Sequence, residues 1–157
     1  MKIKTLISRA RNCKTENDAG ALLETLIRVF GNAKPLSALH VANEEAYMEG
    51  EDPFVRFELN HVISDDYITM IRPEVRNGEV SVYIETSRML DGKGMCSQRW
   101  EQVEGSEELI ECRPDQTVLE VAEIASSLAV ANHRLLIESV GVSKEIAESA
   151  ARASWPA

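Results

Sequence analysis

The chain is poor in cysteine, in long apolar runs and in positive charge, and each shortage excludes a class of protein. Its three cysteines, Cys13, Cys96 and Cys112, are an odd number at wide spacing and include no C-x-x-C pair. This usage is typical of reduced thiols in a cytosolic protein rather than of a disulfide framework or a zinc site. No apolar run approaches the ~20 residues that a membrane-spanning helix needs, and the basic N-terminus lacks the apolar core of a signal peptide. We therefore predict a cytoplasmic protein.

Basic side chains are scarce as well, with 17 Lys and Arg against 26 Asp and Glu and a formal net charge of −9. A non-specific nucleic-acid binder needs a basic face to displace phosphate counterions, and docking onto an anionic membrane needs the same sign of charge. The composition thus argues against direct contact with nucleic acid or membrane. The length of 157 residues and the 44% hydrophobic content predict one domain, residues 1–157, with a core of its own.

The charge is distributed unevenly along the chain. Residues 1–14 carry five basic side chains and no acidic one, so removing their +5 from the total of −9 leaves −14 for the remainder. The segment 44–66 holds eight acidic residues against Arg56 alone, and the segment 101–111 holds five glutamates and no basic residue. The basic N-terminal segment is suited to contact an acidic neighbour, an anionic ligand or the protein's own acidic loops.

Apolar side chains recur at intervals of three and four residues in several segments. This spacing predicts amphipathic helices over 2–13, 19–30 and 118–138, and a last helix over 144–153.

Capping signals flank two of these helices. The run Thr15-Glu16-Asn17-Asp18 is typical of a helix start, because its side-chain oxygens can accept the free amides of the first turn. Thr117 and Glu120 have the spacing of a capping box. Gly31 is expected to end the second helix in the left-handed conformation.

The sequence pattern at the centre of the chain predicts β-structure. Apolar residues alternate with mostly polar ones from Val55 to Ile63, which predicts a half-buried strand. Further strands are predicted over 67–76, 79–90 and 95–103. Helices, then strands, then helices indicate an α+β fold, with an antiparallel β-meander of about four strands and N-terminal and C-terminal helices packed on it.

Asn77-Gly78 is a strong hairpin signal, because both residues tolerate positive φ. A two-residue loop there fixes the strand register by arithmetic, since the numbers of paired residues then sum to 155. Val75 should face Val80, and Ile71 should face Ile84. One face of the hairpin comes out apolar and the other polar, so the register is self-consistent.

The segment 36–53 is ambiguous in its periodicity. Residues 36–47 are compatible with one or two helical turns, whereas Glu-Gly-Glu-Asp-Pro at 49–53 is typical of a solvated loop. We therefore expect 36–53 to form a mobile acidic loop.

No catalytic, metal-binding or nucleotide-binding motif is strong, so no catalytic residue, metal or cofactor is predicted. His61 with Asp65 and Asp66 would offer metal ligands if a turn brought them together, but a strand-end histidine beside a polar turn is the simpler interpretation. The glycine-rich segment 91–94 is interpreted as a hairpin turn, because a strand pattern follows it. The segment 132–153 has some of the spacing of a helix-turn-helix motif, yet its balanced charge favours a plain helical hairpin.

The sequence therefore predicts a non-enzymatic, acidic protein-binding module, an inhibitor or adaptor of a basic nucleic-acid-handling protein. Small phage or mobile-element proteins that block host defence share this profile, and a phage-encoded version would act in the host cytoplasm. We expect acidic residues of the segment 44–66 to steer such a partner and to pair with its Lys or Arg. They are Glu44, Glu45, Glu49, Glu51, Asp52, Asp65 and Asp66.

Two alternatives from other classes stay open. A secretion-type chaperone would bind a client chain, usually as a homodimer, along an apolar stripe exposed on the sheet or on the helix over 118–138. An enzyme or small-ligand-binding protein would need a pocket that converges on His61 or Cys96.

Overall fold

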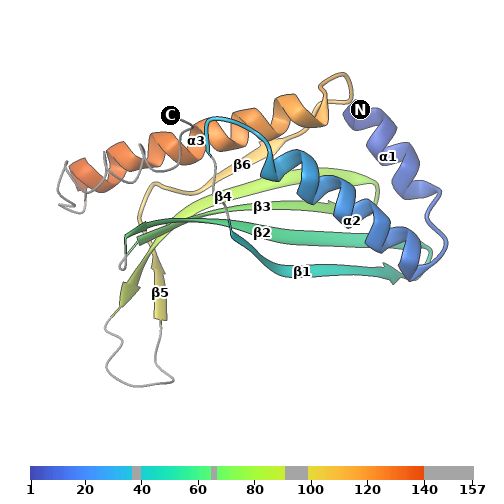
Figure 1. The fold of residues 1–157 in the computed structure, drawn as a ribbon, viewed down its shortest axis with the longest axis horizontal. Helices are drawn as coiled ribbons and strands as arrows, with labels where there is room; N and C mark the ends of the chain where they lie inside the picture. Colours follow the sequence, from blue (N-terminus) through green and yellow to red (C-terminus); the bar gives the residue numbers. More distant parts are fainter. Residues whose placement is uncertain (37–39, 65–66, 91–98, 140–157) are drawn as a thin grey trace.

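In the part of the chain that the structure describes, three helices lie along one face of a six-stranded antiparallel sheet (Figure 1). The computed structural model describes residues 1–36, 40–64, 67–90 and 99–139. The helices are α1 (Ile3–Arg11), α2 (Glu16–Gly31) and α3 (Val118–Ser139). The strands are β1 (His40–Glu49), β2 (Asp52–Ser64), β3 (Tyr67–Arg76), β4 (Glu79–Leu90), β5 (Arg99–Gln102) and β6 (Glu108–Glu111).

The strands β1 to β5 follow one another across the sheet in chain order, and β6 pairs with β4. β5 and β6 occupy successive parts of one edge of β4, because β5 pairs with residues 87–90 and β6 pairs with residues 81–84. The predicted α+β fold, an antiparallel meander with N-terminal and C-terminal helices packed on it, is confirmed. β1 and β6 are strands that the sequence pattern did not predict.

The register of the β3–β4 hairpin is the predicted one. Val75 faces Val80 and Ile71 faces Ile84. Asn77 and Gly78 form the loop with φ angles of 52° and 70°, the positive values that a two-residue hairpin turn requires. The two turn residues were therefore enough to predict the ten residue pairs between β3 and β4.

β1 occupies residues that the sequence pattern assigned to helical turns and a loop, so the prediction of helical turns and a long loop is wrong for the described residues 40–53. A β-bulge near Asn43, which has a φ of 53°, interrupts the alternation that would mark a strand. Val41 packs against the core before the bulge and Ala46 after it, so the inward-facing positions change from odd to even numbers. The expected acidic loop shrinks to a turn at Gly50, whose φ is 67°.

Two smaller features also differ from what the sequence pattern indicated. The acidic segment 101–111 includes β6, whose side chains are exposed except for the half-buried Ile110, so no alternation is visible in the sequence. Gly31 is the last residue of α2 rather than a left-handed cap. Asn32 follows with a φ of −99°, and its side-chain amide donates to the Arg28 carbonyl oxygen at 2.8 Å, which satisfies a free carbonyl at the helix end.

The helix starts at Thr15 and Thr117 are confirmed. The Thr15 hydroxyl accepts a hydrogen bond from the Asp18 amide at 3.2 Å, and the Asp18 carboxylate accepts one from the Thr15 amide at 3.1 Å. Bonds from the backbone amides of Lys14 and Thr15 lower the pKa of the Asp18 carboxyl. At α3, the Thr117 hydroxyl accepts from the Glu120 amide at 3.0 Å.

The core lies between the helices and the sheet. Val55, Phe57 and Leu59 alternate inward from β2 and are fully buried. The rings of Phe57 and Phe30 of α2 meet edge to face, with centroids 6.1 Å apart. The inward side of α3 is built largely from small side chains, which lets this helix approach the sheet closely: Val118, Val121, Ala122, Ala125 and Ala129.

Candidate protein-binding face

No helix covers the second face of the sheet among the described residues, and we call it the open face (Figure 1). Its side chains are those that alternate with the core positions of β1 to β4, together with their register partners on β5 and β6. Eight acidic residues against three arginines give the open face a net charge of −5, with His40 counted as neutral. They are Glu45, Glu49, Asp52, Glu58, Glu74, Glu79, Glu85 and Glu111, against Arg56, Arg72 and Arg76.

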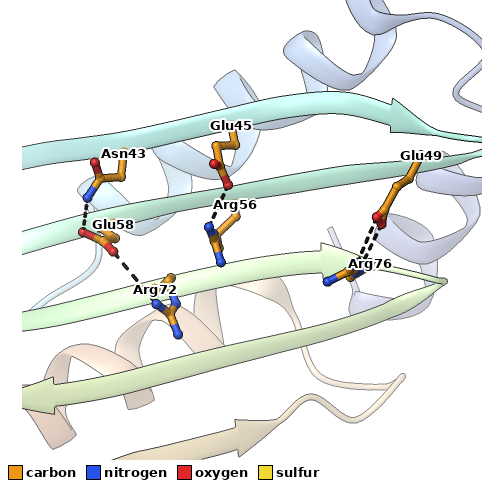
Figure 2. A network of polar contacts seen from close by, with 7 residues as sticks. All are labelled: Asn43, Glu45, Glu49, Arg56, Glu58, Arg72 and Arg76. Atoms are coloured by element: carbon orange, nitrogen blue, oxygen red, sulfur yellow. Dashed lines mark hydrogen bonds and ion pairs between the residues drawn. The ribbon is translucent and has the colours of Figure 1, made fainter.

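Ion pairs cross the open face from strand to strand (Figure 2). Glu49 on β1 accepts two hydrogen bonds from Arg76 on β3, each 3.0 Å long. Glu45 on β1 lies 2.9 Å from the Arg56 guanidinium on β2. These pairs hold long side chains in defined positions, because the forked guanidinium matches the geometry of a carboxylate.

A third pair involves Glu58 at the centre of the face. Its Oε2 accepts a hydrogen bond from the Asn43 side-chain amide at 2.6 Å, and its Oε1 lies 4.0 Å from the Arg72 guanidinium (Figure 2). Asn43 reaches Glu58 because the bulge in β1 places it beside β2. The irregularity that hid β1 in the sequence therefore supplies a polar contact of the open face.

Aromatic rings lie beneath the arginines. The guanidinium carbons of Arg56 and Arg76 lie 5.5 and 5.2 Å from the centre of the Phe54 ring, and the Tyr47 ring lies 5.0 Å away. Phe54 is only 4% exposed although it stands on the open face. The two guanidinium groups above it form cation–π contacts with its ring, and the Tyr47 ring forms an aromatic contact with it.

Tyr83 repeats this arrangement on β4. Its ring lies 5.0 Å from the Arg72 guanidinium, and its hydroxyl donates to Glu85 Oε2 at 2.8 Å. Burial of the ring is the largest cause and this hydrogen bond the second largest cause that raise the pKa of Tyr83 to about 12. The hydroxyl thus stays protonated at neutral pH and remains a donor to Glu85.

A hollow of about 280 Å³ opens in the face between β1, β2, β3 and β4. Its polar lining consists of two carboxylates, two side-chain amides and one hydroxyl, and its apolar lining is one isoleucine and one methionine. The lining residues are Asn43, Glu58, Asn60, Ile68, Met70, Glu85 and Ser87. The lining itself contains no basic side chain, although Arg72 lies beside it, 4.0 Å from Glu58 Oε1.

The structure separates the predicted partner-binding acids into two groups. Glu45 and Glu49 lie on the open face but are already paired with arginines. Glu44, Glu51 and Asp52 are exposed and form no side-chain ion pair among the described residues. The remaining two predicted residues, Asp65 and Asp66, lie outside the described residues.

Glu51 and Asp52 stand at the turn between β1 and β2. They line a second hollow, of about 370 Å³, together with Arg11 of α1 and Lys14. The basic N-terminal segment therefore lies beside an acidic turn of the same molecule. This neighbourhood reduces the negative charge that the turn can offer to a partner.

Sequence reasoning missed other charged residues of the site. Arg72 and Arg76 on β3 come from outside the segment 44–66, so the charge counted along that segment overstates what the folded face carries. Glu74, Glu79 and Glu85 were not considered, although the predicted hairpin register already placed them on the polar side. Listing the charged residues on the polar side of the predicted hairpin would have identified them.

The described structure gives little support to the alternative hypotheses of a metal site or a ligand pocket. His61 is buried on the helix-covered face, on the side of the sheet opposite the 280 Å³ hollow. No group of three His, Cys, Asp or Glu side chains that could hold a metal occurs within the described residues. Burial raises the pKa of the Cys13 thiol and raises that of Cys112 to about 11.

Several predictions fall beyond the described part of the chain. They concern Cys96, the turn at 91–94, the first four residues of the strand over 95–103 and the last helix over 144–153. Of the predicted helical hairpin over 132–153, only the end of α3 is described.

Within the described residues, no helix combines the length and the apolar character that spanning a membrane requires. No protein-family model matches the chain, and no curated protein or solved structure matches it either. The geometry of the open face is therefore the basis for inferring a function.

Proposed function

We propose that the protein is a non-enzymatic binding module whose open face engages a basic, nucleic-acid-handling protein. In this proposal it acts as an inhibitor or adaptor of the kind that phages and mobile elements direct against host defence. The observation that carries the proposal is the net charge of −5 on a broad sheet face that no described helix covers. Such a surface complements a partner rich in Lys and Arg.

The residue types of the open face support this function. Tyr, Phe, Met and Arg are enriched at the centres of protein interfaces, and the face carries Tyr47, Phe54 and Met70 beside its arginines. Because the ion pairs already restrain the long side chains, less conformational entropy is lost when a partner docks.

The acids without an intramolecular ion pair supply the attraction. Glu74, Glu79 and Glu111 of the open face form no side-chain ion pair among the described residues. Unpaired carboxylates attract a basic partner over about one Debye length, ~8 Å at physiological salt. They therefore favour rapid encounter, and binding should weaken as salt rises.

The chaperone alternative has less support. A client groove would need a continuous apolar surface, whereas the open face is mainly charged. On α3, the exposed Leu119 and Ile124 are five residues apart, which places them on different sides of a helix.

The proposal is tested by differential capture from lysate of the native host. Three baits are immobilised: the wild type, an open-face variant and a helix-layer variant. The open-face variant carries Glu74→Gln, Glu79→Gln and Glu111→Gln, and the helix-layer control carries Glu24→Gln, Glu120→Gln and Glu123→Gln. Both variants change the net charge from −9 to −6, so they differ only in where the charge is removed.

We expect a basic nucleic-acid-binding protein on the wild type and on the helix-layer control, depleted at least tenfold on the open-face variant. The purified partner should then be competed from the wild type by its own nucleic acid. Equal capture by both variants, or an enriched partner without a basic surface, would overturn the proposal.

A further inference from the structure

We propose that the 280 Å³ hollow of the open face accepts the guanidinium group of an arginine from the protein partner. The source of the arginine rests on the proposed function, whereas the binding of guanidinium rests on the hollow itself. The hollow is a recess between four strands, so it can enclose one side chain more fully than the flat remainder of the face.

The two carboxylates of the hollow retain acceptor capacity. Glu58 Oε2 is occupied by the Asn43 amide, but Arg72 approaches Glu58 Oε1 only to 4.0 Å. Glu85 Oε2 accepts from the Tyr83 hydroxyl, and its Oε1 has no donor among the described residues. Each carboxylate therefore offers an oxygen to an incoming donor.

Ser87 is the independent sign of a ligand. It is 8% exposed and lines the hollow, yet its hydroxyl has no hydrogen-bond partner within the described residues. A buried hydroxyl is normally paired, because leaving it unpaired forfeits its hydrogen bonds to water. A donor placed in the hollow would satisfy it, and the Asn60 side-chain oxygen offers a further acceptor.

The guanidinium group fits this lining. Arginine presents five N–H donors in a planar fork and no acceptor, so it matches a recess lined by acceptors and carrying two negative charges. Ile68 and Met70 supply an apolar wall for the methylene stem of the same side chain. Methionine is suited to this task because its flexible thioether adapts to the shape of a ligand.

The inference is tested on the isolated protein by NMR. Methionine methyl groups are labelled with ¹³C, and Met70→Leu identifies the Met70 signal, which reports on the hollow. The probe is N-acetyl-L-argininamide. Parallel titrations use N-acetyl-L-lysinamide, which has the same charge but a compact ammonium, and calcium chloride. The variants are Glu58→Gln, Glu85→Gln and Ser87→Ala, with Glu74→Gln as the matched carboxylate outside the hollow.

We expect argininamide to shift the Met70 methyl signal saturably, with millimolar affinity. Glu58→Gln and Glu85→Gln should each weaken binding at least tenfold, Ser87→Ala about threefold, and Glu74→Gln less than twofold. Ser87→Ala keeps both carboxylates and their partners, so its effect does not depend on refolding of the network.

Three results would overturn the inference. They are the lack of a saturable shift, binding of argininamide by Glu58→Gln and Glu85→Gln that is as tight as by the wild type, and a response to lysinamide or calcium equal to that to argininamide. These results leave the capture experiment intact, because that experiment depends on Glu74, Glu79 and Glu111 instead. Conversely, failed capture with retained argininamide binding would refute the proposed partner but not the guanidinium site.

Discussion

The two faces of the sheet are built from the same strands, yet they bury their aromatic side chains in different ways. Phe57 and Phe54 lie three residues apart on β2 and are 0% and 4% exposed. Phe57 faces the helices and meets the ring of Phe30. Phe54 lies on the open face under Arg56 and Arg76. Burial alone therefore does not distinguish a core position from a surface position.

The polar groups of the two faces also differ in how completely they are buried and in what covers them. On the helix-covered face, the hydroxyls of Thr69 and Thr86 are fully buried and hydrogen-bonded to each other at 2.8 Å. On the open face, Glu49 and Arg76 are paired but partly exposed. A buried pair excludes water and can only be lost at a cost in stability, whereas an exposed pair can exchange one partner for another. The covered face should thus control folding, and the open face should control recognition.

The largest effect is expected from truncating the two phenylalanines separately. Phe57→Ala should lower the free energy of unfolding by about 3–5 kcal/mol, because helices and strands cannot close the cavity. Phe54→Ala should cost about half as much, because the flexible side chains above it can collapse into the space. Urea denaturation of both variants measures the difference. Equal losses would mean that the open face is as rigid as the core.

A smaller effect is expected from the buried threonine pair. Thr69→Val or Thr86→Val alone should cost about 1–3 kcal/mol, because each leaves a buried hydroxyl unpaired. The double valine variant should recover most of that loss, since both polar groups are then removed. A double-mutant cycle of unfolding free energies measures this coupling. Additive losses in the double variant would contradict it.

The open-face ion pair should contribute still less. Glu49→Gln, Arg76→Gln and the double variant should give a coupling energy of about 0.2–1 kcal/mol, because both side chains remain in contact with water. In 1 M salt, where the Debye length is about 3 Å, the coupling should shrink further. Denaturation midpoints at low and high salt test both points. A coupling energy above 2 kcal/mol that does not change with salt would contradict this prediction, because it would show that the pair behaves like a buried one.

The last expected effect concerns Tyr83, whose contribution to stability should change with pH only above about pH 10. Its pKa in the folded protein is raised to about 12 from an ordinary value of 10. The associated contribution to stability is therefore complete below pH 10 and is lost as pH rises toward 12. Tyr83→Phe should remove this part of the pH dependence, measured as the difference between wild-type and variant unfolding curves.

The ultraviolet absorbance of tyrosinate provides the second measurement for Tyr83. In Glu85→Gln, which removes the neighbouring negative charge, the highest-pH absorbance transition should move to lower pH. An unchanged transition would show that Glu85 does not influence the Tyr83 hydroxyl.

Much of the fold was predictable because its signals are local. The alternation from Val55 to Ile63 predicted β2, and Asn77-Gly78 predicted the register of β3 and β4. β1 escaped because the bulge near Asn43 reverses the parity of its inward positions. β6 escaped because only Ile110 among its four residues is even half-buried. A strand at the edge of a sheet can be specified by its neighbour rather than by its own pattern.

The candidate site was predictable only in its sign of charge. Glu45 and Glu49 do lie on an exposed sheet face, but the arginines that pair with them are 11 and 27 positions away in the chain. The hollow was not predictable at all, because its lining comes from β1, β2, β3 and β4. No local spacing relates Asn43 to Ser87.

The sequence by itself determined the helix starts, the hairpin register, the apolar side of β2 and an acidic total. These features depend on hydrogen bonds and side-chain alternation within a few residues. Only the tertiary structure decided which carboxylates are neutralised, which aromatic rings lie beneath arginines and where acceptors converge on a recess. Those outcomes depend on strands laid side by side ~4.8 Å apart, so that residues distant in the chain share one electrostatic environment.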